Sequence, residues 1–144
     1  MTGQIRRAVG ADADALTSCI SAAYAGYFQA GIDLPDVSAG VAEDIAAHLV
    51  WVHETGADIT GGIFVSHQGA EAHLMNLAVH PDHMGKRIGS ALIDTALAHL
   101  VDLGVCEVHL ATHKDMPDNV SLYEHLGWRV TGRDGAKVLM TRTL

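Results

Sequence analysis

The chain has 144 residues and a mass of 15.2 kDa, a length that a single hydrophobic core can serve, and its 49% hydrophobic and 18% charged residues are typical of a globular protein. Its 17 acidic and 9 basic side chains give a formal charge of −8, which argues against nucleic acid, because that affinity comes largely from neutralised phosphates, and against an anionic membrane surface. We therefore expect one domain over residues 1–144 that acts on something small.

The first half of the chain predicts two helices and four strands. A short strand over Gln4–Ala8 precedes a helix over Ala11–Tyr27, whose apolar side chains recur every three or four residues and so define one buried face. A loop over Gly31–Gly40 follows. The next predicted elements are a short helix at Val41–Leu49 and strands at Val50–Glu54, Thr60–Gln68 and Ala72–Val79.

The second half predicts a long helix, a strand, a short helix and a hairpin. The long helix ends at Gly104, a residue typical of the position that follows a helix. These elements are expected at Arg87–Leu103, Val105–Ala111, Asn119–Leu126, Trp128–Arg133 and Lys137–Arg142. The order β-α-α-β-β-β-α-β-α-β-β predicts an α/β fold with a mixed central sheet and helices on both faces.

Cysteine and histidine usage favours neither a disulfide scaffold nor a metal centre. Cys19 and Cys106 form no CxxC pattern, which is typical of reduced thiols in a cytoplasmic protein. No apolar run reaches the ~20 residues that span a bilayer, and the basic N-terminus lacks the apolar stretch of a signal peptide. The ten histidines show no HExxH or Cys-His ligand spacing, so we predict no metal site.

The strongest local signal lies between residues 77 and 92, where a strand runs through a glycine-bearing turn into the long helix. This arrangement directs unsatisfied backbone N–H groups and the positive end of a helix dipole at one place. Gly85 and Gly89 would allow a diphosphate to approach the backbone closely. The spacing matches neither a P-loop nor a dinucleotide-binding fingerprint. An anion site is favoured, and a plain strand-turn-helix stays open.

Two segments resemble the signatures of the GNAT N-acetyltransferase superfamily. Leu77-Ala78-Val79-x-Pro81 followed by Gly85-Lys86-Arg87-Ile88-Gly89-Ser90-Ala91-Leu92 resembles the loop that binds the pyrophosphate of acyl-CoA. The run from Asn119 through Tyr123 to Gly127-Trp128 resembles the second signature, a helix carrying a tyrosine followed by Leu-Gly-aromatic. In the first signature Met84 replaces Gln or Arg and Arg87 replaces the first glycine, while Gly89 is retained. The resemblance implies a GNAT-like fold across nearly the whole chain.

The resemblance also implies acetyl-CoA as co-substrate and assigns residues to it. Backbone groups of the strand would pair with the pantetheine arm, and N–H groups of residues 85–90 would bind the pyrophosphate. Lys86 and Arg87 either add charge-assisted contacts to phosphate or are solvated residues of the helix start. Asn119 either binds the CoA arm or caps the short helix. The candidate cofactor-binding residues are Leu77, Ala78, Val79, Met84, Gly85, Lys86, Arg87, Ile88, Gly89, Ser90 and Asn119.

For catalysis the resemblance implies direct attack of an amine on the thioester of acetyl-CoA. Tyr123 stands at the position of the family's acid; a phenol titrates near ~10 and so stays protonated at neutral pH. The backbone N–H of Leu77 is a candidate to polarise the carbonyl. His73 stands where some relatives carry a glutamate base, and strand alternation would place it on the same face as Leu77. Glu71, His113 and a water held by Asn76 remain open as bases.

The acceptor would be bound by the first helix and the loop after it. Tyr24, Tyr27, Phe28 and Ile32–Asp36 would line its pocket, with Asp33 or Asp36 attracting a cation; the alternative is that they are core aromatics and a loop.

We expect a cytoplasmic N-acetyltransferase that acts on a small, cationic primary amine. The alternatives are a protein or peptide N-acetyltransferase and a non-catalytic acyl-CoA-binding sensor. A homodimer is an expectation by analogy with this architecture.

Overall fold

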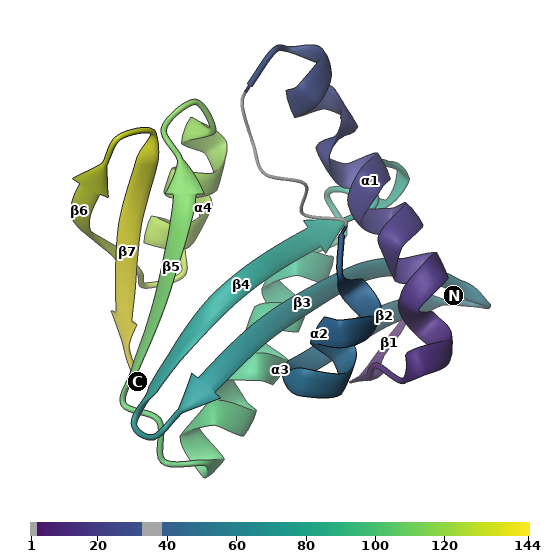
Figure 1. Cartoon of the computed structure of the whole chain (residues 1–144), viewed down its shortest axis with the longest axis horizontal. Helices are drawn as coiled ribbons and strands as arrows, with labels where there is room; N and C mark the ends of the chain where they lie inside the picture. Colours follow the sequence, from purple (N-terminus) through teal and green to yellow (C-terminus); the bar gives the residue numbers. More distant parts are fainter. Residues whose placement is uncertain (1–2, 33–38) are drawn as a thin grey trace.

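The structure, a computed structural model that describes residues 3–32 and 39–144, is a seven-stranded sheet with helices on both of its faces (Figure 1). The strand order is β1-β2-β3-β4-β5-β7-β6. All predicted helices and strands are present, with ends that differ from the predicted ones by two residues at most. The strands are β1 (Gln4–Arg7), β2 (Leu49–Thr55), β3 (Asp58–Gln68), β4 (Glu71–Val79), β5 (Glu107–His113), β6 (Arg129–Asp134) and β7 (Lys137–Thr143). The helices are α1 (Ala13–Gln29), α2 (Val41–Ala47), α3 (Ile88–Asp102) and α4 (Pro117–His125), with 3₁₀ turns at Gly10–Asp12 and Pro81–His83.

Two hydrophobic clusters, one on each face, hold the helices to the sheet. Leu16 and Ile20 of α1 are fully buried against one face, and the apolar side of α3 is buried against the other. Successive side chains of β2 point to opposite faces of the sheet, so Val50 and Val52 pack in the cluster on the α1 side and Trp51 packs in the cluster on the α3 side. The central strands are therefore covered on both faces, as the order of elements predicted.

Strand β3 accommodates the close approach of both helices through paired glycines. A Cβ atom on Gly61 would lie 2.9 Å from Cγ2 of Ile88 in α3, and one on Gly62 would lie 2.6 Å from Cδ1 of Leu16 in α1. Both distances are too short for real side chains. The absence of side chains here lets α1 and α3 contact the sheet directly and fixes where each helix begins relative to β4.

Strands β4 and β5 form the only parallel pair among the described strands, and they separate along most of their length (Figure 1). Pairing is confined to residues 71–73 of β4 and 107–109 of β5. Just beyond, the β3–β4 register shifts so that Phe64 pairs with Asn76 and Val65 with Leu74, which makes Met75 an extra residue, a β-bulge. The bulge bends β4 away from β5 and opens the sheet toward its C-terminal edge.

An ion-pair cluster fixes β1 to the start of α1. Arg6 donates from Nη1 and Nη2 to the two carboxylate oxygens of Asp12 at 2.8 and 2.9 Å, and from Nε to Glu54 of β2. The Asp12 carboxylate also accepts from the backbone N–H of Val9 at 2.8 Å. The Arg6 guanidinium holds the pKa of Asp12 below its ordinary value, because its hydrogen bonds favour the ionised carboxylate.

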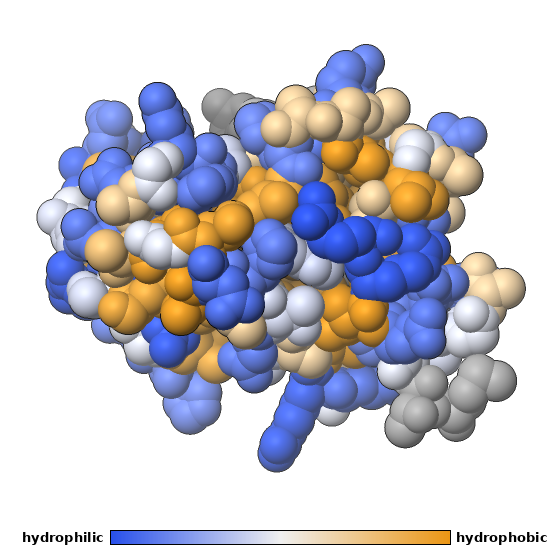
Figure 2. All heavy atoms as spheres, turned by 90° about the horizontal axis from the view of Figure 1, so that it is seen from below, coloured by the Kyte–Doolittle hydropathy of each residue, from blue (hydrophilic) through white to orange (hydrophobic). Residues whose placement is uncertain are grey.

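The surface is mixed in character. Both cysteines are free thiols; Cys19 is buried, as expected of a thiol in the core, whereas Cys106 is exposed. On the face in Figure 2, hydrophilic side chains interrupt the hydrophobic areas. Within residues 3–32 and 39–144, no helix is both long and apolar enough to cross a bilayer.

Candidate functional site

The gap between β4 and β5 holds a cavity of about 340 Å³, within the range of small-ligand sites. Its walls come from β4, β5 and α4, with contributions from α1 and from the turn before β7. Most of its lining is apolar, and the polar groups are few. The lining residues are Tyr24, Leu74, Met75, Asn76, Leu77, Leu110, Ala111, Thr112, His113, Met116, Asn119, Tyr123, Ala136 and Lys137.

Strand β4 presents an unpaired backbone edge to this gap. The N–H of His80 donates to the carbonyl of Thr60 in β3 at 2.9 Å. Because successive residues of a strand direct their N–H and C=O groups to opposite edges, those of Ala78 also face β3, whereas those of Leu77 and Val79 face the gap. No β5 residue pairs with them, since the β4–β5 ladder ends at residue 73. Leu77 and Val79 therefore offer backbone groups to an extended ligand, while buried Ala78 contributes only packing.

The turn after β4 and the first turn of α3 expose further N–H groups. The first helical hydrogen bond of α3 runs from Ala91 N to Arg87 O at 3.1 Å. The N–H groups of Ile88, Gly89 and Ser90 thus have no helical acceptor. Gly85 has a φ of +79°, a conformation that favours glycine. This end of the helix has the donors and the dipole that bind anions.

The basic side chains of the turn are exposed to solvent. Lys86 Nζ lies 3.2 Å from His83 Nδ1, and Arg87 adopts a φ of +60°, the only positive φ among the described non-glycine residues. A left-handed conformation is costly for a residue with a Cβ atom. Arg87 thus holds a strained conformation beside the free N–H groups of α3. Met84, at 69% exposure, contacts no part of the cavity lining.

Tyr123 projects from α4 into the cavity wall, and the residues after the helix hold it there. Its ring stacks edge-on against Trp128 at a centroid distance of 5.6 Å. Gly127 has a φ of +101°, and Arg142 donates to the carbonyl of Leu126 at 2.8 Å, which closes the turn beneath the ring. Burial raises the pKa of Tyr123 well above its ordinary value, and the nearby hydroxyl of Tyr24 adds to the effect. Tyr123 is therefore a neutral phenol at physiological pH.

Tyr24 of α1 lies across the cavity from α4. Its hydroxyl donates to Oδ1 of Asn76 at 2.9 Å and lies 3.5 Å from the carbonyl oxygen of Leu77. Burial raises the pKa of Tyr24 to about 12. Tyr27 packs against Tyr24 but does not line the cavity. Of the side chains expected to line the acceptor pocket, Tyr24 thus lines this cavity and Tyr27 does not. Asp33, Asp36 and the side chain of Phe28 lie outside the described residues, so their part of the expectation stays untested.

The expected position of His73 is wrong. The bulge at Met75 interrupts the alternation, so Leu77 and Val79 pack with Ala72 and Leu74 on the α3 side, opposite to His73. The His73 side chain is exposed outside the cavity, with its ring 5.3 Å from that of His109. The structure therefore does not support His73 as the base, because its side chain does not share a face with Leu77.

Two other candidates do lie on the cavity. His113 is largely buried, and its Nδ1 accepts from the backbone N–H of Asp115 at 3.0 Å. Asn119 also lines the cavity, but its alternative role as helix cap is wrong, because α4 begins two residues earlier and Met116 occupies the N-cap position.

Sequence reasoning missed several cavity residues, among them Leu110, Thr112 and Lys137. Leu110 and Lys137 belong to predicted strands and Thr112 follows one directly, but no local pattern shows that β5 and β7 border the gap. Only the strand order places them there.

Comparisons of the sequence and of the structure with known proteins both find acetyltransferases. The model of the acetyltransferase (GNAT) family matches residues 20–128. An acetyltransferase of Pectobacterium atrosepticum is 31% identical over 78 residues, which is 54% of this chain and 55% of that protein, so the chain spans about half the length of this curated relative. The crystal structure of PaiA N-acetyltransferase from Thermoplasma acidophilum in complex with coenzyme A covers 100% of both chains with a TM-score of 0.88 at 21% identity. The ribosomal-protein-S18-alanine N-acetyltransferase of Escherichia coli covers 99% of this chain and 94% of its own, with a TM-score of 0.83 at 19% identity.

Proposed function

Since the chain belongs to the acetyltransferase (GNAT) family, we propose that it transfers an acetyl group from acetyl-CoA to a primary amine of a small molecule, by direct attack in a ternary complex. The observation that carries the proposal is the alignment of three features along one gap. These are the unpaired edge of β4, the N–H groups at the start of α3, and the buried phenol of Tyr123.

The gap fits an extended ligand with an anionic end. The N–H and C=O groups of Val79 would pair with the amides of a pantetheine arm, as an added strand pairs with a sheet edge, which leaves the N–H of Leu77 for the carbonyl of the thioester. The N–H groups of Ile88, Gly89 and Ser90 would bind the pyrophosphate, and Lys86 and Arg87 would add positive charge. Because backbone groups do most of this, a chain of formal charge −8 can bind so anionic a molecule.

In the reaction the amine nitrogen bonds to the carbonyl carbon of the thioester, and the carbon–sulfur bond breaks. The N–H of Leu77 would stabilise negative charge that develops on the carbonyl oxygen. Tyr123 would give its proton to the departing thiolate, a role open to it because its raised pKa keeps it protonated.

The proton lost by the amine needs an acceptor. Nδ1 of His113 already accepts the backbone N–H of Asp115, so this nitrogen is not available to take the proton. Glu71, the other side chain considered as a base, does not line the cavity. We therefore assign the proton to a water beside Asn76, which does line it.

A cationic acceptor follows from the charge of the chain, since an acidic surface attracts protonated amines. The test is the release of CoA thiol from acetyl-CoA over a panel of polyamines, aminoglycosides and peptides with free N-termini. Acceleration by a small amine supports the proposal, and acceleration only by peptides supports the protein-directed alternative. If calorimetry detects CoA binding but no amine accelerates thiol release, the chain is an acyl-CoA sensor and the enzymatic proposal is wrong.

A further inference from the structure

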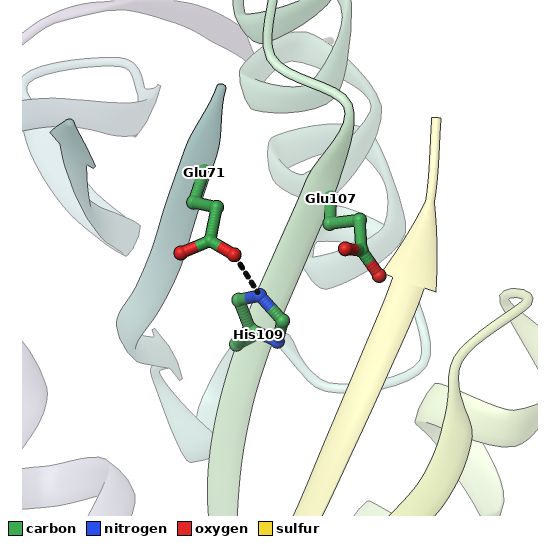
Figure 3. A group of neighbouring side chains, drawn as sticks. All are labelled: Glu71, Glu107 and His109. Carbon is green, nitrogen blue, oxygen red and sulfur yellow. Dashed lines mark ion pairs between the residues drawn. The ribbon is translucent and has the colours of Figure 1, made fainter. Parts of the chain in front are cut away.

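A second cluster of polar side chains lies at the closed end of the gap, where β4 and β5 are still paired (Figure 3). The ladder pairs Glu71 with Glu107 and His73 with His109. Alternate residues of a strand share a face, so all four side chains lie on the same face of the sheet. None of them lines the cavity. The cluster therefore has no part in the proposed acetyl transfer.

Three of these residues bring potential metal ligands together. One atom each of Glu71, Glu107 and His109 lie within 4.8 Å of one another, and Nε2 of His109 is 3.7 Å from Oε1 of Glu71 (Figure 3). Zinc bonds of ~2.0–2.2 Å place the ligands of a tetrahedral site about 3.4 Å apart. The histidine–glutamate pair is already close to that spacing. Rotation of the half-exposed Glu107 side chain would bring in the third ligand.

The imidazole of His109 is held in an orientation suited to a ligand. Its Nδ1 lies 2.9 Å from the hydroxyl oxygen of Thr141, a buried residue on the neighbouring strand β7. With Nδ1–H donating to Thr141, the lone pair of Nε2 is directed toward Glu71. Metal-bound histidines are commonly fixed in this way through their other ring nitrogen.

The charge of the cluster also favours a cation. Two carboxylates sit directly opposite each other on neighbouring strands, an arrangement that is unfavourable without a counter-charge. Within the described part of the chain, the one Lys or Arg paired with either carboxylate is Arg129, whose Nη2 is 4.0 Å from Glu107 and whose side chain is 59% exposed. Arg129 therefore contacts Glu107 in a solvated position, and no described Lys or Arg pairs with Glu71.

We propose that Glu71, Glu107 and His109 bind a divalent first-row transition metal ion of the zinc type. A nitrogen ligand favours such ions over Mg²⁺ and Ca²⁺, which prefer oxygen alone. The ion would join β4 to β5 at the last residues before the strands diverge. It would act on the stability of this junction and not on the reacting atoms.

The experiment titrates Zn²⁺ into the chelator-treated full chain, by calorimetry and by competition with a chromophoric chelator. We expect one zinc site per chain, a thermal midpoint that rises with Zn²⁺ and not with Mg²⁺, and affinity reduced about 10-fold or more in Glu71→Gln and His109→Gln. His67→Gln on β3 is the matched control, because His67 is an exposed strand histidine that pairs with Ala72 and so faces the opposite side of the sheet.

Three outcomes would overturn the proposal. They are no zinc binding by the wild-type chain, wild-type affinity in both cluster variants, or equal loss in the His67 control, which would place the ion at other histidines. Circular dichroism checks the fold of each variant. Glu71, with a side chain 63% exposed, gives a variant whose folding does not depend on the core, so it decides the matter if His109→Gln fails to fold.

Discussion

Replacement of Tyr123 by phenylalanine separates chemistry from binding and from stability, because it removes one oxygen atom and leaves the ring. The ring is 7% exposed and keeps its edge-on contact with Trp128. Burial and the nearby Tyr24 hydroxyl set the pKa of Tyr123, with no contribution from a hydrogen bond to a described residue. Removing the hydroxyl therefore breaks no hydrogen bond to a described residue. We expect the free energy of unfolding to change by less than about 0.5 kcal/mol, which moves the thermal midpoint by about 2 °C at most.

The catalytic effect should be much larger. A positioned general acid contributes about 10²–10⁴-fold to a rate, which corresponds to about 3–5 kcal/mol of transition-state stabilisation. We expect kcat for thiol release to fall by that factor, with the KM for acetyl-CoA nearly unchanged, because the proposed CoA contacts come from β4 and α3. The raised pKa also means that ionisation of Tyr123 should not lower kcat between pH 7 and about 9.

The assay is a continuous thiol-release measurement with the best amine of the panel, and the control is Tyr27→Phe. Tyr27 is a second tyrosine near the site that does not line the cavity, so its loss should leave kcat unchanged. Equal kcat in wild type and Tyr123→Phe would refute the role of Tyr123 as acid. A large drop in thermal midpoint with an unchanged kcat per folded molecule would show that the residue is structural.

Three further changes test other parts of the structure. Gly89→Glu should abolish CoA binding in calorimetry, because the added carboxylate would repel the pyrophosphate. The control Gly89→Ala should bind CoA within about tenfold of wild type, because its Cβ would lie 3.6 Å from Val79 Cγ2, an ordinary contact. Unchanged affinity in the glutamate variant would exclude the phosphate site. Asp12→Asn should lower the free energy of unfolding at pH 7 by about 2 kcal/mol, less than for a fully buried pair because the Arg6 side chain is 32% exposed. The pKa of Asp12 is lowered, so its contribution is present above the ordinary value of 3.8 and fades as pH falls below it; an equal loss in urea denaturation at pH 7 and pH 2 would contradict this. The pKa of Tyr24 is raised from 10.0 to about 12, so its contribution to the free energy of unfolding is complete below pH 10 and is lost between pH 10 and 12. Over that range the free energy of unfolding of Tyr24→Phe should therefore fall less steeply with pH than that of the wild type. Equally steep curves would contradict this reasoning.

The order of elements and the turn that leads into α3 were predictable from the sequence, because both rest on local patterns. The apolar spacing of α1 and α3, the glycine after α3 and the alternation in the strands each depend on residues within one or two turns of one another. The same is true of Gly85 in the turn before α3, whose positive φ favours glycine, whereas the left-handed conformation of Arg87 does not follow from its residue type. The start of α4 lies two residues before the predicted one, since Pro117 at its first position allows the helix to begin before Asn119.

The position of His73 could not be predicted, because strand alternation holds only while the register is regular. The bulge at Met75 depends on how β4 pairs with β3, and that pairing involves residues about ten positions away in the chain. One inserted residue moves every later side chain to the opposite face. The same bulge opens the cavity that Leu77 and Tyr123 line, so the error and the site have one structural cause.

The sequence by itself determined the family, the fold class and the backbone groups proposed to bind CoA, since these follow from short segments whose local conformation their own residues impose. The tertiary structure alone decided which side chains meet. It placed Tyr24 and His113 on the cavity with Tyr123, and it brought Glu71, Glu107 and His109 together although no metal-ligand spacing connects them in the chain. The physical reason is the parallel pairing of β4 with β5 across an intervening helix, a contact between segments more than thirty residues apart that no local pattern encodes.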